Sequence, residues 1–154
     1  MQLSEHTVNI MITAKDVAQF FIMKGIDDDE SGISNLKLQK LLYYAKGFHQ
    51  AIFEEALFPE KLCAWTHGPV VSDMYHAYKS YGGNPIIQVE YNPTDRFDEE
   101  QLELLNEVWS VFGQFSAWKL RDMTHNEKPW QDHESDASII DDEELQEYFK
   151  TRVR

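Results

Sequence analysis

The segment from residue 35 to residue 54 constrains the fold of this chain more than any other. It reads NLKLQKLLYYAKGFHQAIFE, and apart from Gly47 nothing in it would interrupt a helix. Its apolar positions recur at helical spacing and form a stripe wider than a surface helix needs, made of Leu38, Leu41, Leu42, Ala45, Phe48 and Ile52. Only helices on several sides can bury such a stripe. We therefore predict a mainly α fold, a compact helical bundle around this buried central helix, with Ser34 or Asn35 as its N-cap.

The remaining segments predict shorter elements packed around that helix. A capping box of Thr13 and Asp16 begins a helix that Gly25 ends. Further helices are expected at residues 72–81 with Ser72 as N-cap, at 98–115, after Ser116, and at 141–150. Residues 62–66 and 86–90 have strand-like composition and are expected to pair with each other. The bundle should therefore contain at most a small two-stranded β element.

The size and charge of the chain exclude several classes of protein. With 154 residues it fits one domain, which we place at residues 11–154, preceded by an N-terminal extension at residues 1–10. Its 14 Lys and Arg against 27 Asp and Glu give a net charge of −13. Nonspecific binding to nucleic acid or to an anionic membrane requires the opposite charge. Residues 95–154 hold 7 basic and 16 acidic residues, so most of the acid lies in this part of the chain.

Targeting, metal-binding and catalytic signals are absent from the sequence. The N-terminus has no basic region ahead of an apolar one, and no stretch approaches the roughly 20 apolar residues of a membrane span, so we expect a cytoplasmic protein. One cysteine, Cys63, and six histidines without HxH or HxxxH spacing do not make a zinc site. No GxSxG, HExxH or glycine-rich phosphate loop occurs. We expect no metal, no cofactor and no enzymatic activity.

Aromatic residues with polar neighbours are the candidate functional residues. Trp and Tyr are favoured anchors at interfaces, because they bring large contact areas with few rotatable bonds, although many serve the core instead. The candidates, as a binding or structural locus, are Tyr43, Tyr44, Trp65, His67, Gly68, Pro69, Tyr75, His125 and Trp130. We expect the turn at residues 65–69 to be rigid, since Pro fixes φ, and to lie close to residues 125–130.

Four motifs in a fixed order make the sequence similar to a known family. The chain carries MITAKDVA at residues 11–18, LKLQKLLYYA at 36–45, AWTHGPVV at 64–71 and THNEKPW at 124–130, together with Tyr75 and Leu120. In this combination it resembles the Panacea domain family, the SocA-like antitoxins of bacterial and prophage toxin–antitoxin pairs. The resemblance covers about residues 11–150.

The resemblance implies a binding protein. Such antitoxins neutralise a genetically linked protein toxin by direct contact, and at least one relative delivers its toxin to an ATP-dependent protease. Two alternatives stay open at this point. One is a small enzyme that uses His125 or His67 as its acid–base group, in a pocket roofed by Trp65 and Trp130. The other is an acidic, phage-derived mimic of nucleic acid, which would present carboxylates along an exposed face.

Overall fold

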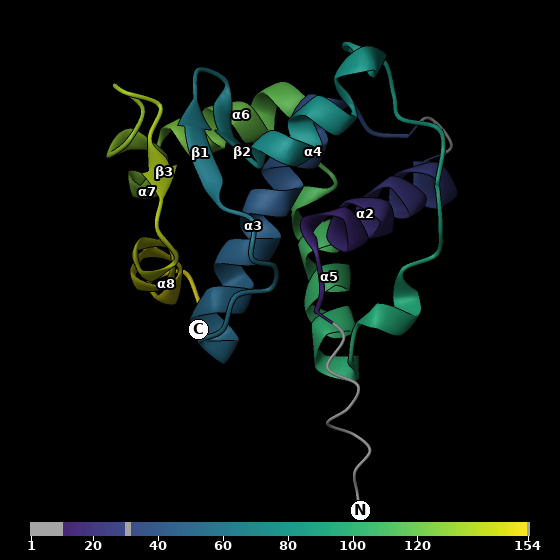
Figure 1. The fold of residues 1–154 in the computed structure, drawn as a ribbon, viewed down its shortest axis with the longest axis horizontal. Coiled ribbons are helices and arrows are strands. Elements are labelled where there is room, and N and C mark those ends of the chain that lie inside the picture. Colours follow the sequence, from purple (N-terminus) through teal and green to yellow (C-terminus); the bar gives the residue numbers. More distant parts are fainter. Residues whose placement is uncertain (1–10, 30–31, 154) are drawn as a thin grey trace, which may run out of the picture.

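A computed structural model of the chain describes residues 11–29 and 32–153, and the expected extension at residues 1–10 lies outside them. The helices are α2 (Ala14–Asp29), α3 (Asn35–Phe53), α4 (Ser72–Ala77), α5 (Glu99–Phe112), α6 (Ala117–His125), α7 (Lys128–Gln131) and α8 (Asp142–Lys150), with short 3-10 turns η1 (Lys79–Tyr81) and η2 (Thr94–Arg96). Three strands, β1 (Leu62–Trp65), β2 (Gly68–Val70) and β3 (Ile139–Ile140), complete the described structure. The fold is mainly α, as predicted (Figure 1).

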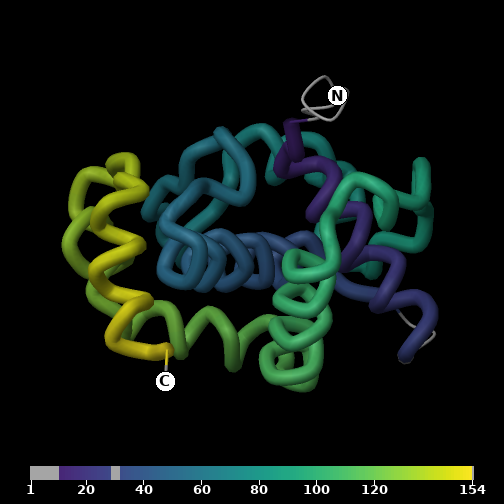
Figure 2. Tube along the Cα trace, turned by 90° about the horizontal axis from the view of Figure 1, so that it is seen from below, coloured from purple at the N-terminus to yellow at the C-terminus, as the bar shows by residue number. Residues whose placement is uncertain are grey.

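Helix α3 is the centre of the bundle. It contacts α2, α5, α6, α8 and β2, and Figure 2 shows it in the middle, between α8 and α2. The Ser34 side chain caps its first turn by accepting a hydrogen bond from Lys37 N. Leu38, Leu41, Leu42 and Ala45 are fully buried. The width of the apolar stripe thus correctly predicted a helix covered on several sides.

Ile52 departs from that prediction. Its side chain is 46% exposed, although its spacing places it in the apolar stripe. It lies in the last turn of α3, one residue before the helix ends at Phe53. Helical periodicity reports which face a residue is on, and it does not report how far the covering elements extend.

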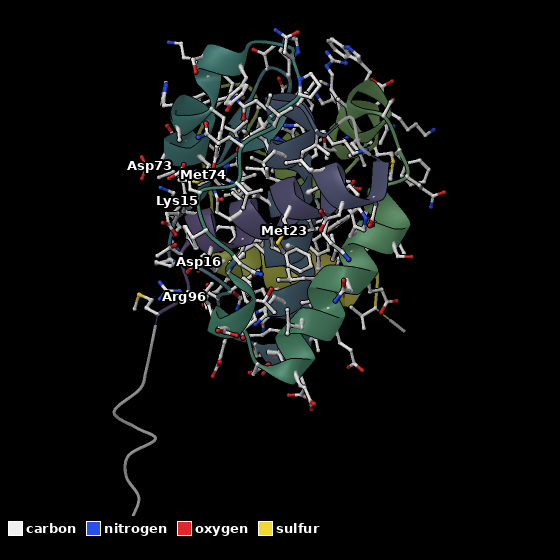
Figure 3. The ribbon with its side chains drawn as sticks, turned by 90° about the vertical axis from the view of Figure 1, so that its right-hand side faces the viewer. Lys15, Asp16, Met23, Asp73, Met74 and Arg96 are labelled. Carbon is white, nitrogen blue, oxygen red and sulfur yellow. The ribbon has the colours of Figure 1, made fainter. Side chains whose placement is uncertain are left out.

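The first turn of helix α2 is capped by side chains and forms an ion pair with η2. The predicted capping box is present, with Thr13 N donating to Asp16 Oδ2 at 2.9 Å and Asp16 N donating to Thr13 Oγ1 at 3.2 Å. Asp16 also pairs with Arg96 Nε at 3.3 Å, and Figure 3 shows the two side chains together at the start of the helix. The helix continues past Gly25 to Asp29, contrary to the prediction. A Cβ at Gly25 would lie 2.9 Å from Ile33 Cγ2, so this glycine permits close packing and does not end the helix.

The β element differs from the prediction in its strands. Strand β1 pairs antiparallel with both β2 and β3, so the sheet has three strands in the order β2-β1-β3. Residues 86–90 do not pair with β1, and Ile86 instead forms an isolated bridge with Ile33. The segment expected as one helix at 72–81 divides into α4 and η1, and its N-cap is Val71, not Ser72. The sheet remains a small part of the molecule.

Candidate functional site

The β1–β2 turn is built on a glycine that no other residue could replace without strain. Trp65 is paired with Gly68, and Thr66 and His67 form the loop between them. Gly68 has φ +110°, which L side chains rarely adopt. A Cβ on Gly68 would also lie 2.6 Å from Lys40 Cε and 2.9 Å from Thr124 Oγ1. The turn is therefore pressed directly onto α3 and α6.

Lys40 lies beneath this turn and is fully buried. Its Nζ donates a 2.8 Å hydrogen bond to the carbonyl oxygen of Pro69. Burial and, to a lesser extent, the nearby charge of Arg121 lower the pKa of Lys40 to about 7. No carboxylate forms an ion pair with Lys40 among the residues that the structure describes. The Lys40 amine thus stabilises the carbonyl of the turn by a hydrogen bond, while burial makes its protonated form less favourable.

The segment at residues 125–130 packs against the same turn. The rings of His125 and Trp130 are stacked, with centroids 3.8 Å apart and an interplanar angle of 5°. The Trp130 Nε1 donates to the carbonyl oxygen of Trp65 at 2.7 Å. Burial, followed by the charge of Arg121, lowers the pKa of His125, although a hydrogen bond with the backbone of Thr66 opposes the shift. The predicted proximity of the two segments is confirmed.

An open groove lies beside this turn, with a volume of about 580 Å³. Trp65 and Tyr75 form one wall, in edge-to-face contact with centroids 5.2 Å apart. His67 and Trp118 line it as well, with ring centroids 5.6 Å apart. Figure 1 shows β2, α4 and α6 gathered around the first half of α3, and Asn35, Leu36 and Gln39 of that helix also line the groove. Its aromatic residues thus come from β1, the β1–β2 loop, α4 and α6.

The sequence comparison assigns these elements to a family. The pattern of the family described as "Antitoxin SocA-like, Panacea domain" matches residues 38–131, more than half of the chain. The chain belongs to this family. No curated protein and no solved structure is similar enough to the chain to count as a match. The matched part of the Panacea domain includes the β1–β2 turn, α4, α6 and the His125–Trp130 segment.

Two of the candidate residues lie in the core of the Panacea domain and not at the groove. Tyr43 and Tyr44 are fully buried. Their hydroxyls donate to the two carboxylate oxygens of Glu127, each at 2.8 Å, and Arg152 Nη1 lies 3.1 Å from Glu127 Oε2. Burial, followed by the charge of Glu127, raises the pKa of both tyrosines, so they remain donors. This cluster fixes α3 to the α6–α7 junction and to the end of α8.

Trp118 and Arg121 are site residues that the sequence analysis missed. The Trp118 side chain is 58% exposed, and the Arg121 guanidinium carbon lies 5.0 Å from the Trp118 ring centroid. Arg121 Nε donates to His67 Nδ1 at 3.2 Å. A signal for Trp118 was available, because it falls outside the face of α6 that buries Leu120 and Thr124. A large apolar side chain on a polar helix face commonly marks a contact surface.

The arrangement favours binding over chemistry at the two candidate histidines. His67 accepts from Arg121, and His125 is stacked on Trp130. In the hydrogen bonds of residues 11–29 and 32–153, neither ring contacts a carboxylate or the side chain of a Ser, Thr or Cys, as a nucleophile–base pair would require. Those residues also contain no group of three or more His, Cys, Asp or Glu placed to hold a metal ion. None of the helices they form is both long and apolar enough to cross a bilayer.

Proposed function

We propose that this chain is an antitoxin that acts in the cytoplasm and neutralises a genetically linked protein toxin by direct binding. Membership of the SocA-like Panacea family supports the antitoxin role. The proposed domain covers residues 11–154, and the proposed contact surface is the aromatic groove face, defined as Trp65, His67, Tyr75 and Trp118. A binding protein of this kind needs no catalytic group, so we propose no enzymatic activity.

The exposed indole of Trp118 is the observation that carries this proposal. A side chain of this size that is 58% exposed leaves apolar surface in water, which costs free energy until a partner covers it. Trp is also the residue most enriched among those that dominate binding energy at interfaces. Its neighbours in the groove are held by Gly68, Pro69 and Trp130, so little ordering would be needed when a partner binds.

The acidic surface supports the same role in a different way. Toxins that act on nucleic acid or nucleotides need basic surfaces, and a chain of net charge −13 would attract them over long distances. Such attraction mainly raises the association rate. The remaining sequence candidates, Gly68, Pro69, His125 and Trp130, are proposed to shape the groove, while Tyr43 and Tyr44 hold the scaffold beneath it.

Co-expression with each neighbouring gene tests the proposal. We expect one neighbour to stop growth alone and to be tolerated with this chain. Trp118→Ala should weaken the rescue, whereas Ile52→Ala should not. Ile52 is a matched control, since it is also exposed but lies about 24 Å along α3 from the groove residue Leu36. If no neighbouring product is neutralised, the proposed function is wrong.

The proposal includes delivery of the bound toxin to an ATP-dependent protease. The half-life of the tagged toxin would be measured in cells with and without this chain. A shorter half-life that requires the protease indicates delivery, and an unchanged half-life with restored growth indicates sequestration. Both results are compatible with neutralisation by direct contact, so the growth experiment remains the test of function.

A further inference from the structure

The groove differs in charge from the rest of the protein. The chain carries 27 acidic residues, yet none of the residues that line this groove is an Asp or a Glu. Four other cavities in the described part of the chain each have at least one carboxylate in their lining. The proposed contact surface thus combines aromatic walls with a lining free of acid.

Two cations stand at the edges of the groove. Lys79, in η1, lines it and is exposed, and no ion pair holds it among residues 11–29 and 32–153. Arg121 does not line the groove but contacts two residues that do, with its guanidinium over Trp118 and its Nε donating to His67. Asp122 pairs with Arg121 Nη1 at 3.1 Å, but the Asp122 side chain is 66% exposed and so only partly offsets the cation.

The charge of Arg121 reaches the groups beneath the turn. Lys40 and His125 both have lowered pKa values, with burial as the first cause and the charge of Arg121 as the second. A positive charge makes protonation of a neighbouring amine or imidazole harder. Arg121 therefore contributes positive potential on this side of a protein that is strongly negative as a whole.

We infer that the groove binds a short segment of the toxin in which an acidic side chain stands next to an aromatic or branched aliphatic one. The apolar side chain lies between Trp65, Tyr75 and Trp118, and the carboxylate pairs with Lys79. The volume of about 580 Å³ is within the range of roughly 300–1,000 Å³ typical of ligand sites. This inference rests on the proposed function and adds the chemistry of the bound segment.

The groove then favours an acidic segment of the toxin, whereas the acidic surface favours a toxin that is basic elsewhere. The carboxylates in the four other cavities would repel an acidic segment, so the groove is the more favourable place for it to bind. A basic toxin that carries one acidic, apolar segment satisfies both surfaces at once. Such a partner binds in one orientation, because reversing it would place like charges together.

Two substitutions that change the net charge equally distinguish a local effect at the groove from the effect of the overall charge of the protein. Lys79→Glu and Lys128→Glu each make the chain more acidic by two charges. Lys128 is the matched control, because it is exposed, lies in α7 and pairs with Asp132, one helical turn away. The probe is the toxin that the growth experiment identifies, and its dissociation constant is measured by surface plasmon resonance at 150 mM salt.

Only Lys79→Glu should weaken binding. We expect Lys79→Glu to weaken binding at least tenfold and Lys128→Glu to leave it unchanged or tighten it. Overlapping 12-residue peptides of the toxin should compete for the wild-type chain only where an acidic and an apolar residue are neighbours. If the toxin is neutralised but Lys79→Glu binds as tightly as Lys128→Glu, the inference is wrong and the proposed function stands. A chain that neutralises no neighbouring product overturns both.

Discussion

The indole Nε1 of Trp130 donates a hydrogen bond to the carbonyl oxygen of Trp65, 2.7 Å away, across 65 residues of sequence. This bond joins the β1–β2 turn to the segment that follows α6. It places the stacked His125–Trp130 pair against the back of the wall that carries Trp65. The groove therefore depends on a contact between two motifs that are far apart in the chain.

Trp130→Phe tests the contribution of that bond to stability. Phe retains an aromatic ring for the stack with His125 but cannot donate, so the Trp65 carbonyl loses its partner. We expect the free energy of unfolding to fall by about 1–3 kcal/mol. Urea denaturation measures it. Trp118→Phe is the control, because the exposed indole should change stability by less than about 0.5 kcal/mol. Equal effects of the two substitutions would contradict the structural role of the bond.

Gly68→Ala tests whether the turn is pressed onto α3 as closely as the structure shows. Gly82 also has a positive φ, of +60°, but a Cβ there would meet nothing within 4 Å. Both alanine variants suffer backbone strain of about 1–3 kcal/mol. Only Gly68→Ala adds a clash with Lys40 and Thr124, so its loss of stability should be clearly larger. Thermal unfolding followed by circular dichroism measures both. Similar melting temperatures for the two variants would show that the Lys40 side chain moves aside for the added Cβ, and that the contact is looser than the structure shows.

Lys40 should make stability depend on pH above neutrality. Its pKa falls from an ordinary value of 10.5 to about 7 in the folded state. Between these values the unfolded chain binds more protons than the folded chain, so the free energy of unfolding rises with pH. The slope is at most about 1.4 kcal/mol per pH unit. Below pH 7 both states are protonated and the slope vanishes.

Other groups titrate in the same range, so the comparison with Lys40→Met isolates this one. The difference in unfolding free energy between wild type and Lys40→Met should favour wild type increasingly from pH 7 to pH 10. Lys119→Met, which removes one exposed amine, should show no such trend. A flat difference for Lys40→Met would mean that the buried amine keeps its proton throughout.

The sequence predicted the centre of the fold well because that information is local. The spacing of apolar residues in α3 is readable within 20 residues, and the neighbours Tyr43 and Tyr44 already point about 100° apart on a helix. Both can be buried only where the helix is covered on more than one side. By contrast, the pairing of Leu62 with Ile140 joins β1 to a strand of two residues, which is too short to show alternation. The pairing of β1 with β3 was therefore missed.

The chemistry of the site was harder to read. A lysine in a helix is normally solvated, and the burial of Lys40 arises only because the β1–β2 turn folds over it. Glu127 is similar, since its two tyrosine partners come from more than 80 residues away. Trp118 was the exception, because its position on the polar face of α6 was visible in the sequence. The roles of Lys40 and Glu127 depend on tertiary contacts that no short sequence pattern encodes.

Charge reversal on α5 tests whether the acidic surface steers the toxin. Glu99 and Glu103 are exposed on this helix and do not line the groove. Glu99→Lys with Glu103→Lys should slow association and flatten its dependence on salt, while dissociation changes little. Stopped-flow kinetics at two salt concentrations measure this. A wild-type association rate that does not vary with salt would contradict steering by this face.

Hydrogen–deuterium exchange of the full chain with and without its toxin tests most directly whether the aromatic groove face is the contact surface. We predict slower exchange in the complex at the amides of residues 66–68, 72–82 and 117–121, which border the groove. Residues 142–150 of α8 should exchange at the same rate in both states. Protection confined to α5 or α8, with the groove amides unchanged in a complex that still neutralises the toxin, would contradict the account.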